Sequence, residues 1–148
     1  MSITKPTSLR ETRPSAFARG LSVHLIEAQA LFVPTLEEVF RDVGLSLLAV
    51  SGDVDLHQLL EAQPDVVFVD ADYVSEEPLR LVNLLRTLVP NGIICVYTSE
   101  RSAGWAKACH LAGATAVFSK NARRNEIISG MRDALLHHTY TDVRLRES

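Results

Sequence analysis

Residues 64–73, with the sequence PDVVFVDADY, constrain the fold of this chain most strongly. Four consecutive apolar residues, 66–69, are followed directly by Asp70. A strand with one solvated face shows a polar residue at every second position, so this unbroken run predicts a strand buried on both faces. In open α/β sheets, ligands bind at the carboxyl ends of such strands. We therefore expect any chemistry of the molecule near Asp70 and Asp72.

Strand and helix patterns alternate five times along the chain. The predicted strands are 21–26, 45–50, 66–70, 93–97 and 115–118, and the predicted helices are 34–43, 55–62, 79–88, 102–112 and a last one around 127–135. The second helix is expected to turn Leu56, Leu59 and Leu60 toward the core. Strands alternating with helices of this length require a parallel sheet with right-handed crossovers and helices on both faces. The predicted fold class is therefore α/β, with a doubly wound five-stranded parallel sheet.

The composition indicates one domain with polar ends. With 148 residues and 47% hydrophobic content, the chain is long enough for one full core and too short for two comfortable ones. Residues 1–20 are polar and contain prolines, four basic residues and one acidic residue, and they are expected to form a flexible basic arm. The domain itself is expected to span 21–138, followed by a tail over 139–148.

The same composition disfavours several classes of partner and site. The body is mildly acidic, which argues against direct binding of nucleic acid. No apolar run approaches the roughly 18 residues of a membrane span, so no membrane contact is expected. Cys95 and Cys109 lack the spacing of metal ligands and are expected to be buried, reduced thiols, in keeping with a cytoplasmic location. The histidines show no ligand spacing except the adjacent His137 and His138, which would point apart on a helix.

Polar side chains gather where the predicted strands end. They are Glu27, Asp70, Asp72, Thr98 and Lys120. Neighbouring carboxylates repel one another unless a cation intervenes, and an ion that prefers oxygen ligands, such as Mg²⁺, is a usual solution. A carboxylate can also act as a nucleophile toward phosphorus, while a hydroxyl and an ammonium group hold the phosphoryl oxygens. Asp70 alone could equally be a turn or helix-capping residue, but together with Thr98 and Lys120 it favours a site of this kind.

At this point residues 21 to about 137 resemble the receiver domains of two-component response regulators. The stretch PDVVFVD looks like the family's phosphoacceptor strand, Thr98 like its switch hydroxyl, and GATAVFSK like the approach to its lysine, here Lys120. The stretch EAQALF and Asn121 are most similar to receivers that precede LuxR-type helix-turn-helix domains.

The resemblance implies both a topology and a role. The fold would be flavodoxin-like, as in CheY, with strand order 2-1-3-4-5, which makes Glu27 and Asp70 neighbours. Asp70 would be the phosphoacceptor, and the partner would be a histidine kinase or phosphotransfer protein. The protein would then be a signalling module and not an enzyme.

The chain also departs from the family pattern at several positions. Receivers place two adjacent acids after the first strand, whereas this chain has Glu27 followed by Ala28, so one magnesium carboxylate is missing. The loop after the phosphoacceptor has Val74 and Pro78 where Pro and Gly are usual, and Val117 stands where a switching aromatic residue often lies.

These departures leave more than one functional reading open. The first reading is an atypical pseudo-receiver with a weak or absent Mg²⁺ site at Glu27, Asp70 and Asp72. The alternative is a fully working stand-alone receiver, in which Asp72 partly replaces the missing acid. A flavin- or nucleotide-binding flavodoxin-like protein is a weaker third reading, because no glycine-rich phosphate loop follows the first strand.

Trp105 is the only tryptophan and lies on the predicted fourth helix. In receivers, that helix and the fifth strand and helix form the usual output face, so Trp105 is a candidate anchor for a protein partner or for a homodimer. The competing interpretation is a half-buried packing residue.

Overall fold

The computed structural model describes residues 20–100 and 102–146. The prediction of a flexible arm falls almost entirely on residues 1–19, which lie outside the described residues. The elements, in chain order, are β1 (Ser22–Ile26), η2 (Ala30–Phe32), α2 (Val33–Val43), β2 (Ser46–Ser51), α3 (Leu56–Ala62), β3 (Val66–Asp70), α4 (Pro78–Leu88), β4 (Ile93–Thr98), α5 (Ala103–Ala112), β5 (Ala116–Ser119), α6 (Arg124–His137), β6 (Tyr140–Thr141) and η3 (Val143–Leu145).

The strands form one parallel sheet in the order β2-β1-β3-β4-β5-β6. The predicted order 2-1-3-4-5 is confirmed for the first five strands. The prediction of five strands was one short, because β6 extends the sheet beyond β5 from within the segment expected to be a tail. Two residues are too few to show any periodicity in the sequence, which explains why the pattern did not reveal this strand.

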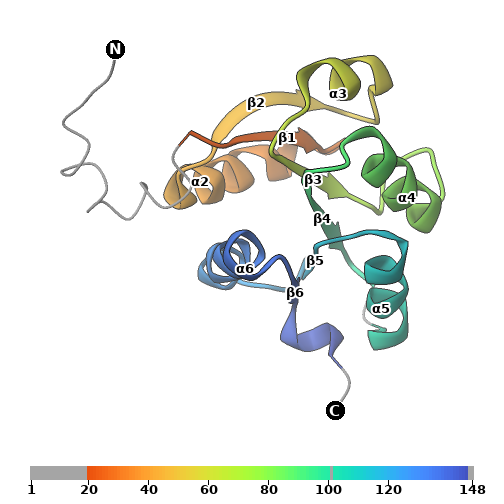
Figure 1. The fold of residues 1–148 in the computed structure, drawn as a ribbon. Helices are drawn as coiled ribbons and strands as arrows, with labels where there is room; N and C mark the ends of the chain where they lie inside the picture. The colour runs from red at the N-terminus through yellow and green to blue at the C-terminus, as the bar shows by residue number, and fades with distance from the viewer. Residues whose placement is uncertain (1–19, 101, 147–148) are drawn as a thin grey trace.

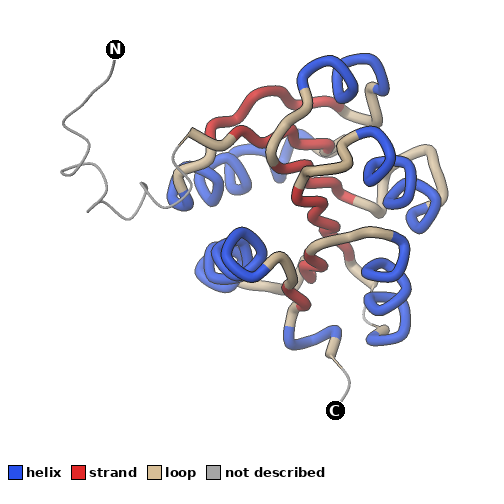
Figure 2. The backbone as a smooth tube through the Cα atoms, viewed as in Figure 1, coloured by secondary structure: helices blue, strands red, loops and turns tan. Residues whose placement is uncertain are grey.

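Helices cover both faces of the sheet, with α2 and α6 on one side and α3, α4 and α5 on the other (Figure 1). The tube view shows the strands as a central layer between them (Figure 2). Strand β3 is buried along its whole length, as its unbroken apolar run predicted. Val66 and Phe68 pack into the core under α2 and α6, whereas Val67 and Val69 pack into the core under the other three helices.

The predicted core face of α3 is partly wrong. Leu59 is fully buried, but Leu56 and Leu60 are 50% and 59% exposed. Because α3 has only seven residues, it touches the rest of the molecule along one narrow stripe. Leu56 and Leu60 are i,i+4 neighbours at the solvent side of this stripe, and both remain largely exposed.

The segment from Tyr140 to Leu145 packs onto the sheet edge. The amides of Tyr140 and Asp142 donate to the carbonyls of Thr115 and Val117, at 3.1 and 2.9 Å. The Tyr140 ring lies on Phe118, with ring centroids 5.1 Å apart. A Cβ atom at Gly130 in α6 would lie 2.6 Å from the Tyr140 ring, so this mid-helix glycine makes room for the segment. The compact part of the chain therefore extends past residue 138.

Both cysteines are free and buried, as expected. Burial raises the pKa of each thiol, so neither is a ready nucleophile. Within residues 20–100 and 102–146, none of the helices has the length and apolar character needed to cross a membrane.

Candidate functional site

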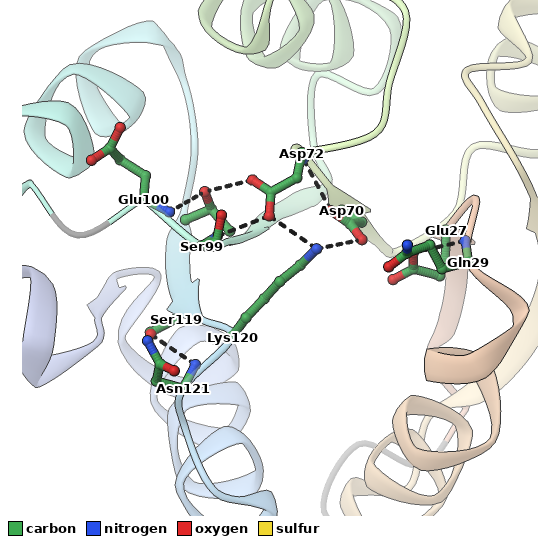
Figure 3. Close-up of polar contacts among 10 residues, drawn as sticks. Glu27, Gln29, Asp70, Asp72, Ser99, Glu100, Ser119, Lys120 and Asn121 are labelled. Atoms are coloured by element: carbon green, nitrogen blue, oxygen red, sulfur yellow. Dashed lines mark hydrogen bonds and ion pairs between the residues drawn. The ribbon is translucent and has the colours of Figure 1, made fainter.

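The structure brings all five candidate side chains together at the carboxyl edge of the sheet (Figure 3). Glu27 follows β1, Asp70 ends β3, Thr98 ends β4 and Lys120 follows β5. The fifth, Asp72, starts the loop after β3. The parallel order explains this convergence, because strands that run in the same direction deliver their ends to one edge.

Lys120 is the cation of the cluster. Its Nζ lies 2.8 Å from Oδ2 of Asp70 and 3.0 Å from Oδ2 of Asp72. Burial alone would lower the pKa of Lys120, but the hydrogen bonds to the two carboxylates outweigh burial and raise it. Lys120 is therefore charged at neutral pH and neutralises part of the negative charge around it.

Three aromatic rings surround the same ammonium group. Nζ of Lys120 lies 5.3, 4.8 and 5.6 Å from the ring centroids of Phe32, Tyr73 and Tyr97. Distances of this size fit cation–π attraction, which helps to fix the position of the ammonium group. Sequence reasoning missed these rings because they come from three separate segments. Tyr73, which follows Asp72, and Tyr97, which precedes Thr98, are next to candidate residues in the sequence, whereas Phe32 is not.

Asp72 makes the densest set of contacts in the cluster. Its Oδ1 accepts from the hydroxyl of Thr98 at 3.1 Å, and its Oδ2 accepts from the backbone amide of Ser99 at 3.0 Å, besides the ion pair with Lys120. Burial would raise the pKa of Asp72, but the hydrogen bonds from Lys120 and Ser99 prevail and lower it. Asp72 is therefore held as a carboxylate.

Glu27 is buried at the opposite end of the cluster from Asp72, next to Asp70 (Figure 3). Its Oε2 accepts from the amide of Gln29 at 3.1 Å, while its Oε1 has no hydrogen-bond partner among the described residues. Burial, followed by the hydrogen bond and charge of Asp70, raises the pKa of Glu27 from 4.5 to about 8. The predicted proximity of Glu27 and Asp70 is thus found in the structure.

This pKa predicts a pH-dependent stability. A carboxyl whose folded pKa lies above its unfolded value keeps an extra proton in the folded state, so stability falls as pH rises from about 4.5 to about 8. Glu27→Gln removes this titration, and relative to it the parent should lose about 3–4 kcal/mol between pH 5 and 8. Urea unfolding across this range measures the difference. The exposed Glu76→Gln is the control, and equal pH slopes in the parent and in Glu27→Gln would contradict the assignment.

Most carboxylate oxygens of the cluster already have partners within the protein. Mg²⁺ needs free carboxylate oxygens in octahedral geometry. Here Ala28 supplies none, Oε2 of Glu27 accepts from the Gln29 amide, and the oxygens of Asp70 and Asp72 accept hydrogen bonds from groups around them. No group of three or more His, Cys, Asp or Glu residues suited to a metal occurs within the described part of the chain.

Trp105 lies half-buried on α5, close to the cluster. It lines a cavity of about 530 Å³ together with Asp72, Thr98 and Ser99. Its backbone amide donates to the Ser102 hydroxyl, which caps the helix. The structure therefore places Trp105 at the edge of the acidic site, and its role as a partner anchor stays a prediction.

The six-stranded parallel sheet with helices on both faces and an Asp–Lys pair at its carboxyl edge defines a class: the chain has the fold of response-regulator receiver domains. No family model and no curated protein matches the sequence. Solved structures do match it.

The chain is similar to a LuxR-family two-component response regulator from Aurantimonas sp. SI85-9A1, at a TM-score of 0.72 and 16% identity over 84% of this chain and 91% of that one. It is also similar to CheY of Borrelia burgdorferi in a CheX–CheY–BeF₃–Mg²⁺ complex. The TM-score is 0.66 and the identity 14%, over 80% of this chain and 90% of that one. The RcsB response regulator of Salmonella typhimurium matches with a TM-score of 0.76 and 10% identity over 86% of this chain. That match spans 64% of the RcsB chain.

Proposed function

We propose that this chain is a receiver-type signalling module of a two-component pathway that acts in the cytoplasm through protein–protein contacts, with Asp70 as an impaired phosphoacceptor. One observation carries the proposal. On a receiver fold, Asp70 ends β3 with Lys120 at 2.8 Å, and Thr98 ends the neighbouring strand β4. In this role the protein is an acceptor and binding module, and it turns over no substrate of its own.

Phosphorylation of Asp70 is impaired because the second acid after β1 is missing. With Ala28 in place of a carboxylate, the cluster has no ligand left over for Mg²⁺, and phosphoryl transfer loses the charge neutralisation that the ion would give. Ala28 is exposed in the loop after β1, so an acid placed there would face solvent and would not strain the core. The position therefore offers a direct test.

The test compares the parent with Ala28→Asp in the presence of Mg²⁺ and acetyl phosphate. The parent should bind Mg²⁺ weakly and gain little or no phosphoryl mass by intact-protein mass spectrometry. Ala28→Asp should bind Mg²⁺ about tenfold or more tightly and be phosphorylated faster. The matched control is Ala30→Asp, which adds the same charge at an exposed position two residues further on, at the start of η2.

The alternative function is a fully working stand-alone receiver. In that case an oxygen of Asp70 attacks the phosphorus of a phosphohistidine, the N–P bond breaks, and the imidazole leaves with its electron pair and takes up a proton. The nearby carboxylate of Asp72 is the observation that favours this alternative, because it adds an acid to the site. Ready phosphorylation of the parent, at the same rate and with the same Mg²⁺ affinity as Ala28→Asp, would establish it.

The interaction face is part of the same proposal. We infer that α5, β5 and α6 contact a kinase, a phosphotransfer protein, another protein partner or a second copy of the chain, with Trp105 at the margin. The β5 edge within this face is paired with β6, so a partner would meet the helices and the segment 140–146 and not an open strand.

A further inference from the structure

Three hydrogen-bond donors from two separate segments converge on the carboxylate of Asp72. They are the hydroxyl of Thr98, the amide of Ser99 and the ammonium group of Lys120, all within 3.1 Å. Figure 3 shows Ser99 and Lys120 on either side of the Asp72 carboxylate. The amide of Glu100 donates to the Thr98 oxygen at 2.9 Å, which leaves the hydroxyl proton directed at Asp72. The side chain of Asp72 is only 22% exposed, so these contacts are partly shielded from water.

This donor set is suited to an oxyanion. A hydroxyl, a backbone amide and an ammonium group are the groups that stabilise negative oxygens on a transferred phosphoryl group. Hydrogen bonds to a charged acceptor are also about twice as strong as neutral ones. Lys120 contacts Asp70 as well, so the donors lie beside the oxygen atoms on which a phosphoryl group would be carried.

We propose that Asp72 is a built-in anion that occupies the phosphoryl pocket of this site. The inference rests on the proposed receiver-type function and specifies how the site is regulated. A phosphoryl group on Asp70 could not reach Thr98, Ser99 and Lys120 without displacing Asp72. The contacts with Asp72 hold Thr98 and Lys120 in the positions in which a phosphoryl group would hold them. The chain therefore has the side-chain arrangement of a phosphorylated site without being phosphorylated.

The reach of the Asp72 side chain supports this assignment, because both of its oxygens are bonded to donors on two other segments. Other acids of the same loop, Glu76 and Glu77, are exposed and bond only to amides of that loop and the start of α4. Asp72 alone among these three reaches across to β4 and β5.

Inorganic phosphate is the probe for the emptied pocket, and it is used in an Asp70→Asn background to remove the charge that would repel it. Asp70→Asn/Asp72→Ala should bind phosphate at least about tenfold more tightly than Asp70→Asn alone, measured by calorimetry. The control, Asp70→Asn/Glu76→Ala, removes an equal charge from the same loop and should bind no more tightly than Asp70→Asn.

A second measurement uses the single variant Asp72→Asn, in which Asp70 is retained. The Ser99 amide proton, read by NMR, should shift upfield in the near-isosteric Asp72→Asn, because its charged acceptor is lost. In Asp70→Asn/Asp72→Ala, added phosphate should move it back downfield.

The proposal requires both results. Phosphate affinity that does not exceed that of the control, or a Ser99 amide unmoved by Asp72→Asn, overturns it. Either result would leave the proposed receiver-type function in place, because that function is tested separately by phosphorylation of the parent and of Ala28→Asp.

Discussion

Replacing Lys120 with methionine is expected to lower the free energy of unfolding by about 3 kcal/mol. Methionine retains most of the aliphatic length of lysine, so the change removes the charge with little loss of packing. The loss arises because Asp70, which is 1% exposed, would be left as a buried carboxylate without its cation at 2.8 Å. Denaturant unfolding at neutral pH measures the effect.

Lys107→Met is the matched control for this prediction. Lys107 is exposed on α5, so the control makes the same chemical change and the same change in net charge away from the cluster. Its effect should stay within about 0.5 kcal/mol. In addition, Asp70→Asn introduced into the Lys120→Met variant should restore part of the lost stability. If the two lysine variants are equally stable, the ion pairs of Lys120 contribute nothing measurable.

Much of the fold could be predicted from the sequence because its signals are long and repeated. The run 66–69 marks the central strand, and the alternation of strands and helices requires a parallel sheet, whose strand ends lie at one edge. The strand order that makes Glu27 and Asp70 neighbours came from the resemblance to receivers. The shared edge depends on backbone direction alone. Any side chain placed at a strand end reaches the same edge.

The contacts of Asp72 could not be predicted in the same way. Asp72 was identified as a candidate because it follows the central strand, but its partners depend on how the loop after β3 turns. In the structure that turn directs the carboxylate to Thr98 and Ser99 and not only toward a metal position beside Glu27. A sequence pattern specifies which element a residue follows, whereas the direction of a loop side chain depends on packing between elements.

The C-terminal segment shows a second limit of sequence reasoning. Residues 139–148 are polar and short, so they suggested a tail. Their contacts are nevertheless specific, with Tyr140 on Phe118 and Arg144 bridging Asp142 and Glu126. One local hint in the sequence was Gly130 inside α6, where a Cβ atom would clash with the rings of both Tyr140 and Phe118.

Leu145→Ala tests whether this segment is an integral part of the fold. Leu145 is 1% exposed and belongs to the core under α3, α4 and α5. Truncating a buried leucine removes transfer free energy and leaves a cavity, so we expect a loss of about 3 kcal/mol in the free energy of unfolding. Val143 lies in the same short helix but is 60% exposed, and Val143→Ala should change stability by no more than about 0.5 kcal/mol.

Hydrogen exchange gives an independent reading of the same change. The amides of Tyr140 and Asp142 are bonded to β5 and should exchange slowly in the parent. In Leu145→Ala they should exchange faster, because the side chain that holds the segment down is lost. Amides in β3 should remain the most protected, and their protection should fall only by the loss in global stability. Equal stability of Val143→Ala and Leu145→Ala, or fast exchange of both amides already in the parent, would mean that the segment is not docked in solution. The helices α5 and α6 and the edge of β5 would then be open to a partner, and the interaction face proposed for this chain would have to be redrawn without β6.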